Sequence, residues 1–320
     1  GYLAWQLDWR AFAAELHRLN GWYVPGLVLL LLAVLWLRAL RWRLLLPQGG
    51  QLSIRRLAEA TVLGFFASFV LPLRAGELIR PWVLSRLQPV PLPTALASIV
   101  AERCLDALSL LAFLGLCLRG APAMPDYVLA GARTVGVIAT LLLAVLILCR
   151  VRPAAATGLA HRFARRVIEP RFPHLADRFV GIIDTFVDGL RGVSRPWHLA
   201  AAVFYSFLVW LLMAVWYQVA MWMFGEHPSW WVGMVLNVMI AMAVAAPSAP
   251  GFIGTFQAGC VLALAVIFPY TREFAVAYSL VTHLVQTVVV LVAGFAVLQS
   301  CGLRWATLRR PPAGAEIPKK

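Results

Sequence analysis

Lysine and charge are scarce in this chain of 320 residues. Its only lysines are Lys319 and Lys320, and charged residues make up 13% of the sequence. Apolar residues make up 62% and the mean hydropathy is +0.81, which excludes an ordinary soluble globular fold and indicates a polytopic membrane protein. The formal charge of +14 is carried almost wholly by arginines beside apolar runs. This placement disfavours nucleic-acid binding and favours anionic lipid head groups as partners.

The sequence contains none of the common cysteine, histidine and glycine motifs of soluble enzymes. The five cysteines are far apart and form no C-x-x-C pair, and the six histidines show no metal-ligand spacing. The sequence also has no P-loop, no dinucleotide fingerprint and no G-x-S-x-G motif. We therefore expect no metal, no cofactor and no catalytic residue, and a protein that is not an enzyme.

Two of the apolar runs are interrupted by proline and glycine. The first break is Leu71-Pro-Leu-Arg-Ala-Gly-Glu-Leu-Ile-Arg80 and the second is Pro247-Ser-Ala-Pro-Gly-Phe-Ile-Gly254. Free backbone groups at membrane depth are tolerated only where protein or a water-filled cavity receives them, so both breaks predict a cavity. We interpret residues 57–90 as a re-entrant helical hairpin, and the runs 232–246 and 255–268 around the second break as another.

Uninterrupted apolar runs predict full membrane spans at about 23–40, 93–118, 127–149, 196–224 and 272–299. Residues 7–19 and the second part of 150–195 have the apolar periodicity of amphipathic helices on the membrane surface. Arginine-rich loops mark the cytoplasmic side of a membrane. Residues 38–56 and 150–195, and the C-terminal tail from Arg304, are therefore expected on the cytoplasmic side of the cell inner membrane.

The order of spans and breaks predicts an all-α polytopic transmembrane fold made of two inverted repeats, each with a re-entrant helical hairpin. We expect one transmembrane domain over 1–320, with a first repeat over 1–118, a second repeat over 119–149 and 196–300, a cytoplasmic amphipathic segment over 150–195, and a basic cytoplasmic tail over 301–320. The first repeat lacks one span, which we expect to precede Gly1.

Three motifs follow one another along the chain: Leu71-Pro72-x-Arg74-x-Gly76-Glu77-x-x-Arg80, Glu102-Arg103-x-x-Asp106 and Pro247-x-x-Pro250-Gly251-x-x-Gly254. Together with Arg41-Trp42 at the end of the first span, they resemble the flippase-like integral membrane family that includes the membrane part of lysylphosphatidylglycerol synthases. The resemblance covers nearly the whole chain and implies a lipid translocase domain. Phe252 and Gln257 depart from the usual glycine and glutamate of that family, so the resemblance implies no proton-linked or cation-linked role for the second hairpin.

Charged side chains lie next to the first break. Arg74, Glu77 and Arg80 must form ion pairs or be hydrated, because each charge would cost roughly 2.5–3.5 kcal/mol in hydrocarbon. In one interpretation an arginine binds a phosphate while Glu77 holds that arginine in position. In the other the three residues are a structural clasp that fixes the hairpin. Both interpretations stay open.

The next span carries Glu102 and Asp106, four residues apart on one helix face, with Arg103 beside them. One carboxylate pairs with Arg74 or Arg80 across the cavity, the two carboxylates share a proton or a cation, or all belong to a buried ion-pair network. Catalysis is required by none of these alternatives.

The second break supplies backbone groups in place of charges. Pro247, Pro250, Gly251 and Gly254 free N–H and C=O groups, and the helix that restarts near Gly254 would point its positive dipole end into the cavity. These backbone groups form an anion-binding site, called the anion seat below, or the break is only a structural kink. Asn237, Gln257, His283 and Gln286 are candidates to line the same space. The candidate substrate-binding residues are Arg74, Glu77, Arg80, Glu102, Arg103, Asp106, Pro247, Ser248, Pro250, Gly251, Gly254 and Gln257.

The function we expect is translocation of a lipid with an anionic or phosphate-containing head group, either a phospholipid or a polyprenyl-phosphate-linked lipid. A membrane-bound transferase, or a subunit that presents lipid to one, is the second hypothesis, and a secondary transporter of a small anion is the third. The expected partners are the membrane lipid, a lipid-modifying enzyme and a second copy of the chain in a homo-oligomer. We expect no binding of nucleic acid.

Overall fold

The computed structural model describes residues 8–47, 49–71, 76–120, 125–191, 196–245 and 249–302. Its α-helices are α2 (Trp9–His17), α3 (Val24–Leu45), α4 (Ile54–Val70), α5 (Gly76–Leu87), α6 (Leu92–Gly120), α7 (Asp126–Val151), α8 (Pro153–Phe163), α9 (Pro173–Arg191), α10 (Pro196–Met223), α11 (Trp230–Ala245), α12 (Thr255–Val261) and α13 (Arg272–Ser300). Shorter 3₁₀ or π-helical turns cover Gly21–Tyr23, Gly49–Gln51, Ala164–Ile168, Pro250–Phe252 and Leu262–Ile267. These described ranges contain no strand, so the predicted all-α class is confirmed.

Several of these helices have the length and the composition of membrane spans. Four segments are long and apolar enough to cross a membrane: Gly21–Leu45, Trp197–Met223, Pro250–Ile267 and Arg272–Ser300. Helices α6 and α7, with 29 and 26 residues, also exceed the roughly 20 residues that a span needs. α6 differs from the others because Glu102, Arg103 and Asp106 lie near its middle. The protein is a multi-pass membrane protein.

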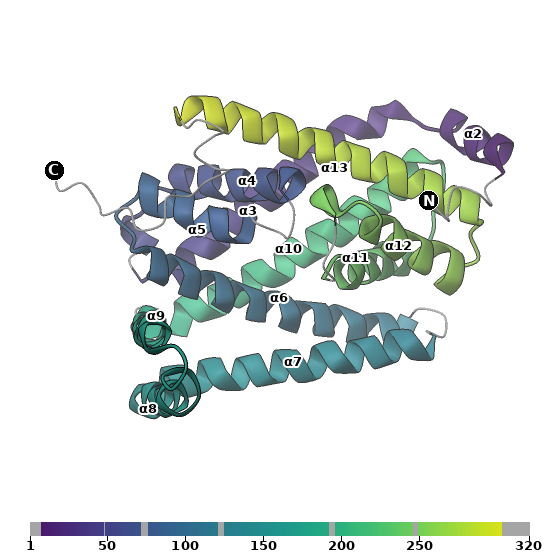
Figure 1. Ribbon diagram of the computed structural model, residues 1–320. Coiled ribbons are helices and arrows are strands. Elements are labelled where there is room, and N and C mark those ends of the chain that lie inside the picture. The colour runs from purple at the N-terminus through teal and green to yellow at the C-terminus, as the bar shows by residue number, and fades with distance from the viewer. Residues whose placement is uncertain are drawn as a thin grey trace.

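The long helices enclose two short helix pairs (Figure 1). α13 runs along one side of the molecule, and α6 and α7 run along the other. The α4–α5 pair lies toward one end and the α11–α12 pair toward the opposite end, while α10 crosses obliquely between them. α8 and α9 are seen almost end-on beside one end of α7, so their axes lie across the long helices. This crosswise placement is what a helix on the membrane surface requires.

The α4–α5 pair is antiparallel and very tightly packed. A Cβ atom on Gly76 would overlap the carbonyl oxygen of Gly64, so the two backbones touch and only glycine fits at this position. At the open end of the pair, the Ser53 N–H donates to Gln88 Oε1 at 3.4 Å, so the chain enters and leaves in the same place. The helix pair expected over residues 57–90 is therefore present, and its re-entrant placement in the membrane stays a prediction.

The α11–α12 pair also closes through a glycine. A Cβ atom on Gly259 would lie 2.7 Å from the Cα of Ile240 on the facing helix. Between the helices, Gly251 and Gly254 have φ values of 69° and 92°, which glycine adopts without strain, and Phe252 has a φ of 62°. Both breaks are thus flanked by close-packed helices, while the inverted relationship of the two halves stays a prediction.

The terminal part of α3 corrects one expectation. We placed the end of the first span at about residue 40 and assigned Arg38 and Arg41 to a cytoplasmic loop, but α3 continues to Leu45. Arg41 is fully buried, so it is an interior charge and not a loop residue. The helix continues past the apolar run because Glu102 and Asp106 of α6 compensate the charge of Arg41, as described below.

The two predicted amphipathic helices are present within the described ranges. In the N-terminal part, α2 covers Trp9–His17, and Arg18 ties it to the loop after α10 through an ion pair of 3.1 Å with Glu226. In the polar segment 150–195, α9 is the predicted helix, and α8 is an additional helix that we did not expect. His161 of α8 lies 3.3 Å from Asp184 of α9 and joins the two.

Buried apolar side chains form two main clusters. The larger cluster joins α3, α6, α10, α11, α12 and α13, and the smaller one joins the second half of α3 to α4, α5 and the start of α6. Buried tryptophans satisfy their N–H groups in both clusters. Trp216 Nε1 donates to the Leu27 carbonyl at 2.9 Å, and Trp42 Nε1 donates to Ser98 Oγ at 2.7 Å.

Candidate functional site

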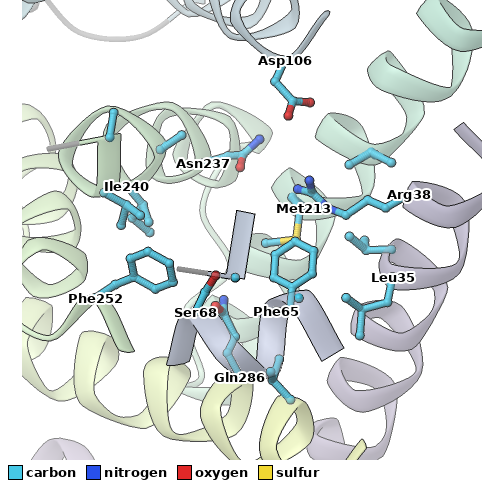
Figure 2. A pocket seen from close by; sticks show the side chains of 18 of the residues that line it. Leu35, Arg38, Phe65, Ser68, Asp106, Met213, Asn237, Ile240, Phe252 and Gln286 are labelled. Atoms are coloured by element: carbon cyan, nitrogen blue, oxygen red, sulfur yellow. The ribbon is translucent and has the colours of Figure 1, made fainter. Parts of the chain in front are cut away.

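A cavity of about 400 Å³ lies between the two helix pairs. Side chains from α3, α4, α5, α6, α10, α11, α12 and α13 line it, so it is built by both halves of the chain. Most of the lining is apolar. Figure 2 shows Arg38, Asp106 and Asn237 toward one side of this space and Ser68 and Gln286 toward the other.

Glu102 is the centre of a buried ion-pair network behind the cavity wall. Its carboxylate is fully buried and accepts hydrogen bonds from Arg80 Nη1 at 2.7 Å and from Arg103 Nη2 at 3.0 Å. Arg41 Nη2 lies 2.9 Å from the same oxygen. One carboxylate of α6 therefore joins α3 through Arg41 and α5 through Arg80.

Asp106 extends this network to the cavity. It accepts a short hydrogen bond from Arg41 and forms an ion pair of 3.0 Å with Arg103. Arg103 also lies 3.7 Å from Glu77, next to the first break. Two of the alternatives that the sequence left open are thus realised together: Glu102 pairs with Arg80, and both carboxylates of α6 belong to a buried ion-pair network.

Arg80 is held from a second direction. Its guanidinium carbon lies 4.0 Å from the centre of the Trp42 ring, a cation–π contact that also screens the charge from lipid. Trp42 is fully buried and fixed by its hydrogen bond to Ser98. Nε and Nη2 of Arg80 nevertheless have no hydrogen-bond partner among the described residues, so part of its donor capacity remains free.

Arg38 lines the cavity together with Arg80 and Arg103. It lies one helical turn before Arg41 on α3, is half-buried, and sits 5.2 Å from the centre of the Phe65 ring. In Figure 2 its guanidinium points into the same space as Asp106. Within the described ranges no carboxylate lies within ion-pairing distance of Arg38, although Asp106 attracts it from farther away. Its donors are therefore available to a ligand.

The end of α4, just before the first break, meets the second break at the cavity. The Phe69 ring, near the end of α4, packs edge-on against Phe252 with 5.6 Å between ring centres. A Cβ on Gly251 would lie 3.3 Å from the carbonyl oxygen of Phe69, so the end of α4 touches the second break almost backbone to backbone. The two helix pairs are therefore in direct contact at this point.

Hydrogen bonds hold the second break against α13. His283 Nε2 donates to the Gly251 carbonyl at 2.7 Å, and Gln257 Nε2 donates to His283 Nδ1 at 3.0 Å. This pair of contacts fixes the tautomer with the proton on Nε2. The N–H of Gly254 donates to Gln257 Oε1 at 2.8 Å. These hydrogen bonds give His283 a role in packing the second break against α13. They are explained without a proton relay.

The candidate residues named from the sequence separate into three groups. Glu77, Arg80, Arg103 and Asp106 line the cavity, and Glu102 lies directly behind them. Gln257, Pro250, Gly251 and Gly254 are not part of the lining; Gly254 is exposed and its N–H donates to Gln257 Oε1, and the anion seat at this helix end stays a prediction. Arg74, Pro247 and Ser248 lie outside the described residues.

Sequence reasoning missed Arg38 and Arg41 as site residues. Their signal was the spacing of three residues, which puts both on one face of α3, together with the acidic pair Glu102 and Asp106 that needed basic partners. Asn237, His283 and Gln286, which the sequence analysis named as possible neighbours of the second break, do line the cavity.

Comparison with known proteins now places this chain. The family described as the lysylphosphatidylglycerol synthase TM region matches residues 1–294. The chain belongs to this family. A curated relative, Glycosyltransferase AglD of Haloferax volcanii, is 26% identical over 299 residues, which cover 85% of this chain and 47% of the relative. The chain therefore spans about half the length of that relative, and no solved structure matches it.

Proposed function

We propose that the protein is a lipid translocase, which moves a lipid with an anionic or phosphate-containing head group between the two leaflets of a membrane. The head group passes through the cavity between the two helix pairs, and the lipid tails stay in the surrounding bilayer. The observation that carries this proposal is Arg38, a cavity arginine that has no carboxylate in ion-pairing distance among the described residues.

The charge of the site supports an anionic head group. Its described arginines are Arg38, Arg41, Arg80 and Arg103, and its described carboxylates are those of Glu77, Glu102 and Asp106. Among the described residues, four arginines against three carboxylates leave one positive charge in a largely apolar space. An uncompensated charge away from water is costly, and a phosphodiester of charge −1 removes this cost while accepting the fork of a guanidinium.

The two helix pairs supply the path. In this proposal they are re-entrant hairpins of two inverted repeats that enter the membrane from opposite sides and meet at Phe69 and Phe252. Separation of the first helix pair from the second opens the cavity to one leaflet. The arrangement around Arg38 is the same before and after this separation. The site has no nucleotide-binding motif, so a gradient, the membrane potential or a coupled synthesis drives the movement.

A membrane-bound transferase, or a subunit that presents lipid to one, is the second candidate. It is favoured by the relative from Haloferax volcanii, which is named a glycosyltransferase and is about twice as long as the matched region. In that case the same cavity holds the lipid while chemistry takes place elsewhere. Within the described part of residues 150–195, the His161–Asp184 contact joins two half-exposed side chains and resembles a helix-to-helix link more than a catalytic pair.

Reconstitution tests the leading proposal. Liposomes with phosphatidylglycerol that carries a fluorescent tail are treated with a membrane-impermeant quencher, and the rate at which inner-leaflet probe becomes quenched is measured. We compare wild type, Arg38→Gln and the matched control Arg10→Gln, which replaces an exposed arginine of α2. Loss of a charge-assisted hydrogen bond is worth about 1.5–3 kcal/mol, or roughly 10- to 150-fold in rate.

The variant Arg38→Gln should keep the fold, because no described ion pair is broken by it. We expect wild type and Arg10→Gln to move the lipid equally and Arg38→Gln to be slower by at least tenfold, with equal melting temperatures. Equal rates for Arg38→Gln and wild type would remove the proposed site. Release of entrapped inorganic phosphate without lipid movement would instead identify a transporter of a small anion.

A further inference from the structure

α8 lies at the edge of the molecule and contributes no side chain to the lining of the cavity. Figure 1 shows it beside one end of α7, with α9 between it and α6. α7 ends at Val151 and α8 begins at Pro153, so a single residue separates the two helices. Because α7 is long enough to span a membrane, a helix that turns crosswise directly after it stays at the depth where α7 leaves the bilayer. The chain connection therefore holds α8 at a membrane surface.

Three faces follow one another around α8. Ala156 and the first residue of the next turn, Ala164, are buried, and Ala156 packs with apolar side chains of α7 and α9. Next to this face, Leu159 and Phe163 lie four residues apart and form an exposed apolar stripe. On the other side of the stripe, Arg162 is exposed. A helix that borders on protein, lipid and water at the same time has this order of faces.

The stripe is one part of a larger exposed apolar group. Five apolar side chains in residues 159–175 are more than half exposed: Leu159, Phe163, Val167, Phe172 and Leu175. They come from α8, the turn after it, the connection that follows and the start of α9. Single exposed apolar side chains are common on proteins, whereas a group of them marks a surface that contacts another apolar molecule or phase.

The same stretch carries an excess of positive charge. Residues 159–177 contain four exposed arginines and two exposed carboxylates, those of Glu169 and Asp177. None of these arginines forms an ion pair with a residue that the structure describes. The aliphatic part of an arginine lies along an apolar surface while its guanidinium reaches a phosphate. Arginines beside an apolar stripe therefore match an anionic lipid, whose acyl chains and phosphate are neighbours. The four arginines are Arg162, Arg165, Arg166 and Arg171.

We propose that α8, the turn Ala164–Ile168 and the start of α9 form a docking surface for the anionic phospholipids of the adjoining leaflet. The five apolar side chains enter the acyl boundary, and the four arginines bind lipid phosphates. A soluble acidic protein would match the charge, but it would not explain why the connection to α7 holds this surface at the depth of the membrane.

Docking also fixes α9 in place. One small apolar cluster joins Ala156 of α8 to Val187 of α9 and to Ala101 of α6, so α8 and α9 are held by the membrane on one side and by α6 on the other. The lipids bound at this surface belong to the bilayer and are not cargo. The inference therefore goes beyond the proposed function and does not depend on it.

The depth of α8 in membranes of different charge tests this surface. A nitroxide on Leu159→Cys reports depth through the ratio of its accessibilities to oxygen, which is enriched in the bilayer, and to a water-soluble nickel complex. The full chain carries Cys301→Ser, because the other four cysteines are buried. The protein is studied in nanodiscs of phosphatidylglycerol and in nanodiscs of phosphatidylcholine. A control label on Val137→Cys, at an exposed position of α7, should lie in the bilayer in both.

In phosphatidylglycerol the label on α8 should be more accessible to oxygen, and in phosphatidylcholine it should become accessible to the nickel complex. Each arginine near an anionic surface shifts the docking equilibrium by roughly fivefold, so the combined variant Arg162→Gln, Arg165→Gln and Arg166→Gln should dock about 100-fold more weakly. The matched variant with Arg162→Lys, Arg165→Lys and Arg166→Lys keeps the charge and should dock as the wild type does. An unchanged signal from Val137→Cys shows that each variant keeps its fold.

Three results would overturn the docking surface. Equal immersion of the label in both lipids would mean that apolar contact alone holds α8. Access of the nickel complex in both lipids would place the surface in water and leave it to a soluble partner. Equal immersion of the glutamine and lysine variants in phosphatidylglycerol would mean that the arginines do not bind the lipid. None of these results bears on lipid movement through the cavity, which the comparison with Arg38→Gln measures separately.

Discussion

Replacement of Glu102 by glutamine is the sharpest test of the buried network. Glutamine has nearly the same volume and keeps an acceptor oxygen, but it removes the negative charge shared by three arginines. Arg41 and Arg103 keep Asp106 as a partner after this change. Arg80 is left with the Trp42 ring as its described partner, and its side chain is only 6% exposed.

The size of the effect follows from these contacts. Removal of one partner from a buried ion pair costs about 3–5 kcal/mol, because the remaining charge is left uncompensated. The Trp42 contact offsets up to about 2 kcal/mol of interaction energy, but it is present before and after the change and so does not reduce the difference. We therefore expect Glu102→Gln to lower the free energy of unfolding by about 3–5 kcal/mol.

The assay is unfolding in mixed micelles by titration with sodium dodecyl sulfate, followed by tryptophan fluorescence. The control Glu15→Gln removes a carboxylate whose partner Arg18 has a side chain 52% exposed, so the expected loss is below about 1 kcal/mol. A second variant, Glu102→Gln with Arg80→Met, removes the stranded charge and should recover about 1–3 kcal/mol. A loss below about 1 kcal/mol for Glu102→Gln would refute the argument that this network holds α3, α5 and α6 together.

Two further predictions concern the first helix pair and the topology. Gly76→Ala would place a Cβ on the carbonyl oxygen of Gly64, so the two helices of the first pair should be forced apart. Lipid movement should then fall to the protein-free rate, and amide hydrogen exchange in α4 and α5 should rise. Unchanged exchange would contradict the backbone contact. The loop at residues 225–231 has no lysine or arginine, so Ser229 is predicted outside, and the first helix pair is predicted to enter from the cytoplasm, which places Ser85 there. A membrane-impermeant maleimide added to intact cells should therefore label Ser229→Cys and not Ser85→Cys, and the reverse pattern would invert the topology.

The helix pairs could be predicted from the sequence because their signals are local. An apolar run, a break with Pro72 or Pro250, and a second apolar run specify a pair of short helices without reference to the rest of the chain. The glycines that let the helices touch, such as Gly64 and Gly76, are visible in the sequence but do not reveal which partner they contact. For this reason the pairs were predicted and their packing was not.

The inner charges could be predicted only in part, because an ion pair has two distant members. The sequence placed Glu102 and Asp106 on one face of α6 and required basic partners for them. It offered Arg80, which does pair with Glu102, and Arg74, which lies outside the described residues. It did not offer Arg41, which is 65 residues from Asp106 and stands where the apolar run of α3 ends. Only the tertiary contact shows that the helix continues inward past that point.

The second break was predicted as an anion seat made of backbone N–H groups or as a structural kink, and the structure adds a hydrogen bond that neither interpretation included. The side chain three residues after Gly254, that of Gln257, accepts a hydrogen bond from the Gly254 N–H. A glutamine at this position in the chain is a sign of helix capping, which is visible in the sequence. In this half of the chain, polar side chains of the cavity lining include Asn237, His283 and Gln286.

The two helix pairs are attached to the rest of the protein by interactions of different kinds. α5 is bound to α3 and α6 by the ion pairs of Glu102 with Arg80 and Arg41, which cost several kcal/mol to break when buried. The turn of the second break contacts its neighbours through the hydrogen bond of His283 to the Gly251 carbonyl and a Phe69–Phe252 ring contact, each worth about 1 kcal/mol. The helices α11 and α12 on either side of this turn belong to the larger buried apolar cluster. Charge therefore fixes the first pair, whereas apolar burial and neutral hydrogen bonds fix the second.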